Sequence, residues 1–102
     1  MTREALEARW FALTRKELPG MAQERRWPVR LDHCFQRILL DNAVGMAWRE
    51  AIRPPAYRNA SDEQLAKAVA LGEAAARGEE DLAALNRRSL VWRGKSLPRQ
   101  PG

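Results

Sequence analysis

Apolar side chains recur every three or four residues along most of this chain, and that spacing predicts helices. The first apolar stripe includes Leu6 and Trp10 and follows Thr2, whose hydroxyl is suited to cap a helix N-terminus. We expect this helix to end before Pro19-Gly20, because proline lacks the backbone N–H that a helix interior uses. Alternation of apolar and polar residues never runs far enough to predict a strand.

The most apolar stretch runs from Trp27 to Trp48 and predicts a central helix near residues 31–44. Gly45 follows, and glycine readily adopts the left-handed conformation that ends many helices. Because the apolar residues of this helix project on two opposite sides, we expect it to be packed on both and to lie in the middle of the fold. One side carries Leu31, Phe35, Ile38 and Leu39, and the other carries Leu40 and Val44.

The second half of the chain predicts three more helices. A short one spans residues 46–52. A longer one starts at Ser61, since Ser61 and Gln64 have the spacing of a capping box, in which each side chain bonds the backbone N–H of the other residue. Gly72 lies on the apolar face of that helix and allows a neighbouring helix to approach closely. The last helix follows the acidic residues 79–81, whose negative charge suits a helix N-terminus.

The composition is that of one globular domain. The chain has 102 residues, of which 45% are hydrophobic and 30% charged. We predict a small all-α domain, a single array of about five helices over residues 1–92, followed by a basic, flexible C-terminal tail over residues 93–102. No apolar run reaches the roughly 20 residues of a membrane span, and the N-terminus lacks the apolar region of a secretory signal. We therefore expect a soluble, cytoplasmic protein.

His33 and Cys34 are the only histidine and the only cysteine, and they are neighbours in the sequence. A structural zinc site usually takes four ligands, mostly Cys and His pairs at short spacings. One residue of each type cannot supply such a set, so we expect no metal, and no motif indicates a cofactor. On the predicted helix Cys34 faces the edge of the core, where a free thiol behaves as a small apolar side chain.

His33, Arg37 and Asp41 are spaced four residues apart, so they lie along one side of the predicted central helix. In one interpretation they form a proton-transfer site, with His33 titrating and Arg37, held by Asp41, binding an anion. In the other they form a salt-bridged flank of the helix without catalytic chemistry. We favour the second interpretation.

The formal net charge of +5 is unevenly distributed. Residues 61–86 carry two basic and six acidic side chains, whereas residues 87–102 carry five basic ones and no acidic one. Such a basic tail can bind a polyanion or fold back onto the acidic helices. Each of the four tryptophans also has an arginine beside it, and single-stranded nucleic acids are bound by such combinations of aromatic and basic side chains.

These patterns leave three hypotheses for function. The first is non-catalytic binding of an anionic partner, foremost nucleic acid, through backbone or single-strand contacts with little sequence specificity. The second is a protein-interaction or regulatory module, including a homodimer. The third is an enzyme or small-molecule binder that uses His33, Arg37 and Asp41. The nucleic-acid surface of the first hypothesis consists of basic residues at helix ends and in the tail: Arg25, Arg26, Arg87, Arg88, Arg93, Lys95 and Arg99.

Overall fold

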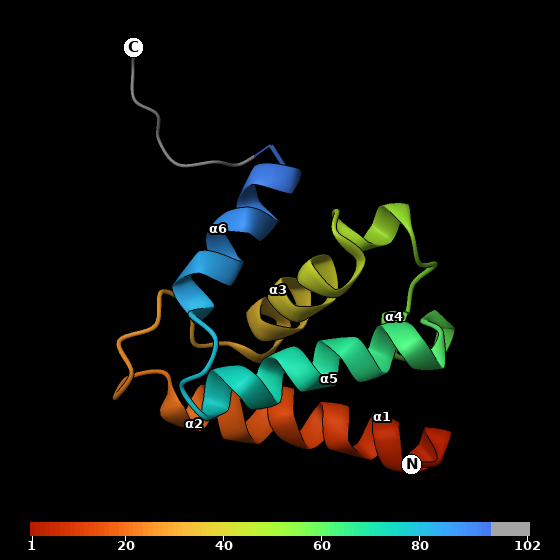
Figure 1. Ribbon diagram of the computed structural model, residues 1–102, viewed down its shortest axis with the longest axis horizontal. Coiled ribbons are helices and arrows are strands. Elements are labelled where there is room, and N and C mark those ends of the chain that lie inside the picture. Colours follow the sequence, from red (N-terminus) through yellow and green to blue (C-terminus); the bar gives the residue numbers. More distant parts are fainter. Residues whose placement is uncertain (95–102) are drawn as a thin grey trace.

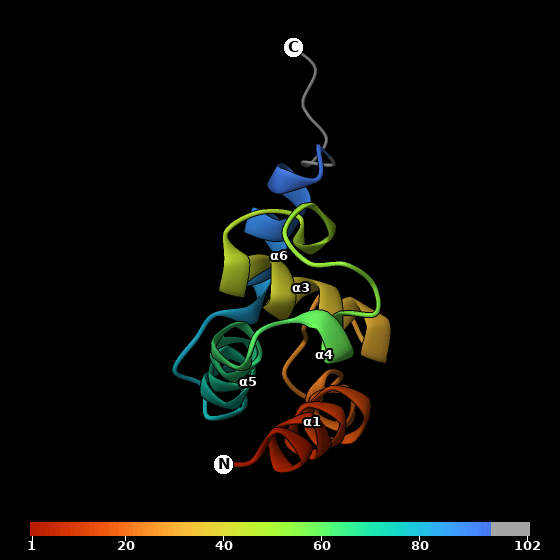
Figure 2. The ribbon, with the colours of Figure 1, turned by 90° about the vertical axis from the view of Figure 1, so that its right-hand side faces the viewer.

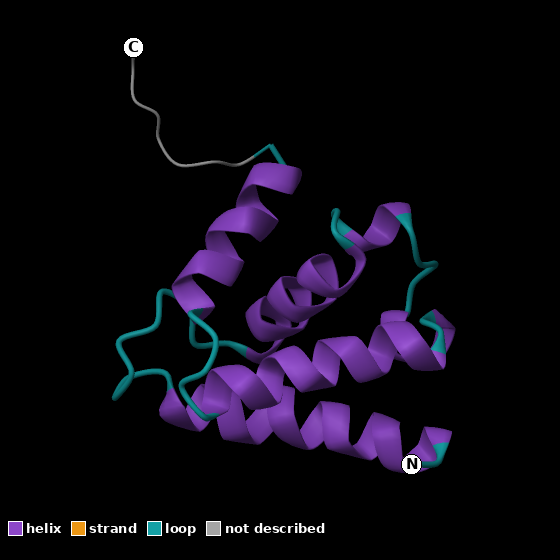
Figure 3. Ribbon diagram, in the orientation of Figure 1, coloured by secondary structure: helices purple, strands orange, loops and turns teal. Residues whose placement is uncertain are grey.

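The computed structural model describes residues 1–94 and confirms the predicted all-α fold (Figures 1 and 3). Short loops join the helices, and within these residues there is no strand. The elements in chain order are α1 (Arg3–Ala12), the π-helical turn η1 (Leu13–Glu17), α2 (Leu18–Met21), α3 (Asp32–Val44), the 3₁₀ turn η2 (Trp48–Glu50), α4 (Ala56–Asn59), α5 (Asp62–Ala76) and α6 (Leu82–Trp92).

The helices stack in three layers. The two views show α1 and α5 side by side, α3 across them, and α6 on the far side of α3 (Figures 1 and 2). Phe35 and Ile38 on one side of α3 and Leu40 on the other are all buried, and Gly45 ends the helix at a φ of 77°. The predicted central helix is therefore confirmed. Leu31 differs from the prediction, because it precedes the first turn and is 57% exposed.

The first helix runs farther than predicted. It begins after Thr2, whose side chain accepts a hydrogen bond from the backbone of Ala5, but it does not end before Pro19. In η1 the Leu18 N–H donates to the carbonyl of Leu13, the i to i+5 pattern of a π-helix. Pro19 then falls in the first turn of α2, where its missing N–H removes no bond. The predicted stop at Pro19 was wrong for this reason.

The start of α5 and its crossing with the neighbouring helices follow the sequence closely. The Ser61 hydroxyl accepts from the Gln64 N–H at 3.0 Å, and the Gln64 side chain accepts from the Ser61 N–H at 2.9 Å, so the capping box is confirmed. A Cβ atom added to Gly72 would lie 2.5 Å from a methyl of Leu13 and 2.9 Å from a methyl of Leu39. At Gly72, α5 therefore approaches its neighbours more closely than any side chain larger than that of glycine would permit.

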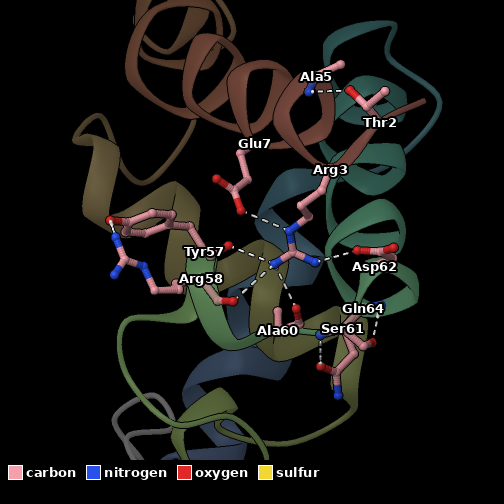
Figure 4. A network of polar contacts seen from close by, with 10 residues as sticks. All are labelled: Thr2, Arg3, Ala5, Glu7, Tyr57, Arg58, Ala60, Ser61, Asp62 and Gln64. Atoms are coloured by element: carbon pink, nitrogen blue, oxygen red, sulfur yellow. Dashed lines mark hydrogen bonds and ion pairs between the residues drawn. The ribbon is translucent and has the colours of Figure 1, made fainter.

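An arginine clamp joins the beginning of α1 to the segment before α5 (Figure 4). Arg3 pairs with Glu7 at 2.9 Å and with Asp62 at 2.7 Å. Its remaining nitrogen donates to the carbonyls of Tyr57 and Ala60, each at 2.8 Å. All three guanidinium nitrogens are therefore engaged in holding the fold.

The chain between α3 and α4 forms a wall beside α3. The predicted helix over residues 46–52 is reduced to the single turn η2, and Ile52 after it is buried. The Trp48 N–H donates at 2.8 Å to the carboxylate of Asp41, which fixes the start of this turn.

Trp10 is fully buried, whereas Trp27, Trp48 and Trp92 are half-buried. Across residues 1–94, no helix combines the length and the apolar character needed to cross a bilayer.

Candidate anion-binding pocket

A cavity of about 620 Å³ lies between the N-terminal helix, α3 and the chain from η2 to α4. We call it the arginine pocket, because arginines from four separate segments line it. Its cationic and titratable lining residues are Arg15, His33, Arg37, Arg49 and Arg93, and its aromatic ones are Trp10, Phe11, Trp48 and Tyr57. Among the described residues, no aspartate or glutamate lines it.

Arg93 is committed to a buried carboxylate behind the pocket. Asp41 is fully buried and accepts from Arg93 Nε at 2.7 Å and from Arg93 Nη2 at 2.9 Å. The Ser89 hydroxyl and the Trp48 N–H donate to the same carboxylate at 2.7 and 2.8 Å. The hydrogen bonds that Arg93 donates to Asp41 raise the pKa of Arg93. Arg93 therefore belongs to the folded body rather than to a tail, and its charge is compensated.

Arg37 is held by neutral groups. Its Nη1 donates to Ser89 Oγ at 2.6 Å and its Nη2 donates to Asn86 Oδ1 at 2.9 Å. The sequence-based interpretation had Asp41 holding Arg37, but the Ser89 hydroxyl stands between the two. Within residues 1–94 Arg37 forms no ion pair, so it presents an uncompensated positive charge at the pocket wall.

Arg15 and Arg49 lie at the exposed rim, each over an aromatic ring. The guanidinium carbon of Arg15 is 3.9 Å from the centroid of the Phe11 ring, and that of Arg49 is 5.3 Å from the Trp48 ring. Such cation–π contacts position a guanidinium without neutralising it. Neither arginine pairs with a carboxylate of the described part of the chain.

His33 and Cys34 have separate environments. His33 lines the pocket, its side chain is 73% exposed, and its Nδ1 lies 3.6 Å from Asp32 Oδ1. Cys34 is half-buried and does not line the pocket. Of the three candidate residues for proton transfer, His33 and Arg37 therefore reach the cavity, while Asp41 is buried behind it.

The other predicted binding residues lie outside the lining of this pocket. Arg25 donates to the carbonyls of Ala75 and Ala76 at the end of α5, at 3.3 and 2.8 Å, and so acts as a C-terminal cap. Arg26 is exposed in the loop after α2, with a φ of 56°. Arg87 and Arg88 are exposed on α6, and Lys95 and Arg99 lie outside the described residues.

Comparisons with known proteins leave function to be inferred from these residues. Neither a family model, nor a curated protein, nor a solved structure matches this chain. In the described part of the chain, no three His, Cys, Asp or Glu side chains gather as a metal ion would require. What the pocket offers is positive charge, hydrogen-bond donors and aromatic surface.

Sequence reasoning missed Arg15 and Arg49 as site residues. Both carry a local signal, because Arg15 follows Phe11 by four residues and Arg49 adjoins Trp48. These are spacings at which a guanidinium can reach a ring. That the two rings face one cavity depends on packing between segments about 35 residues apart, which no local pattern reveals.

Proposed function

We propose that this protein binds an anionic ligand in the arginine pocket. One observation carries the proposal: Arg15, Arg37 and Arg49 come from three segments, line one cavity, and have no carboxylate partner among the described residues. A cleft lined by charges of one sign focuses the electric field and attracts ligands of the opposite sign.

Arg37 is suited to be the central anion-binding residue. Ser89 and Asn86 fix its guanidinium from the side of α6 and leave further N–H groups of the fork unused. A fixed guanidinium fork can bind two oxygens of a phosphate or carboxylate at once. Because the side chain is already ordered, little conformational entropy is lost when the ligand binds.

The first hypothesis from the sequence is thereby moved to another surface. The anionic partner would be bound by pocket residues that converge, and not by the exposed arginines of α6 or the bases at helix ends. A nucleic acid remains one such partner, since its phosphates meet the arginines and its bases meet the aromatic rings.

Titration with inorganic pyrophosphate tests the proposal, using isothermal calorimetry at low and at high salt. We expect binding that weakens as salt rises, and a loss of about tenfold or more in affinity for Arg37→Met and for Arg49→Gln. Arg49 makes no hydrogen bond with the described residues, so its variant keeps the fold intact.

Arg87→Gln is the matched control, because it removes one exposed charge from a residue of α6 that does not line the pocket. It should leave pyrophosphate binding almost unchanged. The proposal fails if wild-type protein does not bind pyrophosphate at low salt, or if Arg87→Gln weakens binding as much as Arg49→Gln does.

A further inference from the structure

Gln36 presents a hydrogen-bond acceptor in a pocket whose other polar groups are mainly donors. It lies on α3 next to Arg37 and lines the pocket. Its Nε2 donates to Thr14 Oγ1 at 3.0 Å, and the Thr14 hydroxyl donates to the carbonyl of Trp10 at 2.9 Å. Thr14 is fully buried and its hydroxyl has a single proton, which the Trp10 carbonyl takes.

This arrangement fixes the orientation of the Gln36 amide. Because Thr14 Oγ1 can only accept, the Gln36 nitrogen must face it, and the carbonyl oxygen Oε1 faces away. No described residue donates to Gln36 Oε1. The pocket therefore combines a set of anion-binding forks with one acceptor whose position is held by a buried hydrogen-bond chain.

The aromatic part of the pocket adds a third requirement for a ligand. Trp48 and Tyr57 line the wall together with Pro54 and Pro55, and the Phe11 and Tyr57 rings meet edge to face at 5.0 Å. Flat ligand rings stack on such surfaces. A complementary ligand has an anionic group, an aromatic ring and an amino group that projects from that ring.

We infer that the ligand is a nucleotide whose base carries an exocyclic amino group. Its phosphate binds the arginines, its base lies against the aromatic wall, and its amino group donates to Gln36 Oε1. This inference rests on the proposed function and names the ligand class of the same pocket. Cytosine and adenine carry such an amino group on the edge used for pairing, whereas uracil and hypoxanthine carry a carbonyl oxygen there.

Two matched ligand pairs test the inference by calorimetry: CMP against UMP, and AMP against IMP. The members of each pair have the same phosphate and nearly the same shape, so a difference in affinity reports the amino group. We expect CMP and AMP to bind about fivefold more tightly than UMP and IMP, the effect of one net hydrogen bond.

Variants then assign the discrimination to its residue. Gln36→Met keeps the length of the side chain and removes the acceptor, so the CMP to UMP ratio should fall to about one. Arg49→Gln should weaken CMP and UMP equally and keep the ratio. Equal affinity for CMP and UMP in the wild type, or a ratio that survives Gln36→Met, would overturn the inference.

The same nucleotide chemistry can come from a free nucleotide or from the phosphorylated 5′ end of a single strand. Free CMP is therefore compared with a short oligonucleotide that begins with 5′-phosphorylated cytidine and with the same strand without its phosphate. Either source supports the inference if removal of the terminal phosphate lowers the affinity of the oligonucleotide for the protein. Equal binding of the two strands, together with equal affinity for CMP and UMP, would overturn it.

The outcome with pyrophosphate separates this inference from the proposed function. Pyrophosphate binding that depends on Arg37, without discrimination between the bases, leaves the anion pocket intact and overturns the nucleotide assignment. Tighter binding of phosphotyrosine than of CMP does the same, because that ring carries no amino donor. Absence of all anion binding overturns both.

Discussion

Arginines on two sides of this molecule differ in what holds them. Arg3 and Arg9, beside α5, are each bound by two carboxylates. Arg15, Arg37 and Arg49, at the arginine pocket, have none within residues 1–94. The charge of the first set is compensated by the carboxylates that join the helices, whereas the charge of the second set is available to a ligand. The same residue type thus joins helices in one place and leaves uncompensated charge in the other.

The paired side shows how complete the compensation is. Arg9 binds Glu17 within the N-terminal helix and Glu73 on α5, the latter at 2.8 Å. The hydrogen bond that Arg9 donates to Glu17, followed by the one it donates to Glu73, raises the pKa of Arg9. Asp62, followed by Glu7, raises the pKa of Arg3 in the same way. The carboxylate partners therefore hold both arginines in their charged form.

Of the variants considered, Asp41→Ala should have the largest effect on the free energy of unfolding. Among the described residues, Asp41 is the one carboxylate that neutralises a lining arginine. Asp41→Ala leaves Arg93, the Ser89 hydroxyl and the Trp48 N–H without their acceptor. We expect a loss of about 3 kcal/mol in the free energy of unfolding, measured by urea denaturation. Folded protein should bind pyrophosphate more tightly, because Arg93 becomes a fourth uncompensated arginine at the pocket.

Glu50→Gln is the control for that variant, since Glu50 is exposed and has no described partner. Its effect on stability should stay within about 0.5 kcal/mol. If Asp41→Ala were as mild as this control, the buried carboxylate would not organise the back of the pocket.

A substitution at Gly72 tests the helix packing without changing any charged residue. In Gly72→Val the new side chain meets the buried methyl groups of Leu13 and Leu39 at the closest point between α5 and its neighbours. We expect the free energy of unfolding to fall by about 2 kcal/mol, while pyrophosphate affinity of the folded protein is unchanged. Gly20→Val is the matched control, because nothing lies within 4 Å of a Cβ at that position. Equal losses in the two variants would mean that the close crossing has no cost of its own.

A pair of arginine variants tests the contrast directly. Arg3→Met removes two ion pairs and three hydrogen bonds to carbonyls, so we expect a loss of about 1 kcal/mol in stability and no change in pyrophosphate binding. Arg15→Met should do the opposite, with stability within about 0.5 kcal/mol and affinity about tenfold lower. Urea denaturation and calorimetry on both variants measure the two effects. A parallel loss in both properties for either variant would remove the distinction between the two sets.

Local sequence was sufficient for much of the fold. The central helix, its end at Gly45 and the capping box of Ser61 and Gln64 all depend on residues within a few positions of one another, and all three are confirmed. The stop predicted at Pro19 was wrong, because a local rule about proline applies only when the residue lies in a helix interior. Here a π-helical turn makes Pro19 the beginning of the next segment.

The arginines of the pocket have hydrogen-bond partners that are far away in the sequence. Arg93 was assigned to a free tail, yet it pairs with Asp41, 52 residues away. Arg37 was assigned to Asp41, yet Ser89 separates them and comes from α6. Helix packing decides which arginine a buried carboxylate neutralises. The spacing of residues in the sequence does not contain this information.

The smallest expected effect concerns an exposed pair that belongs to neither set. Arg77 binds Glu79 at 2.9 Å, two residues away, and this hydrogen bond lowers the pKa of Glu79. A lowered pKa means that the pair stabilises the fold above the ordinary pKa of a glutamate, and that this contribution disappears as the pH falls through the lowered value. An NMR titration should show the pKa of Glu79 returning toward its ordinary value in Arg77→Gln, with little change in stability at neutral pH, since water screens both groups. A clear loss of stability at neutral pH would show that even an exposed local pair holds the fold. Compensation by a carboxylate would then no longer distinguish the half-buried structural arginines from the rest.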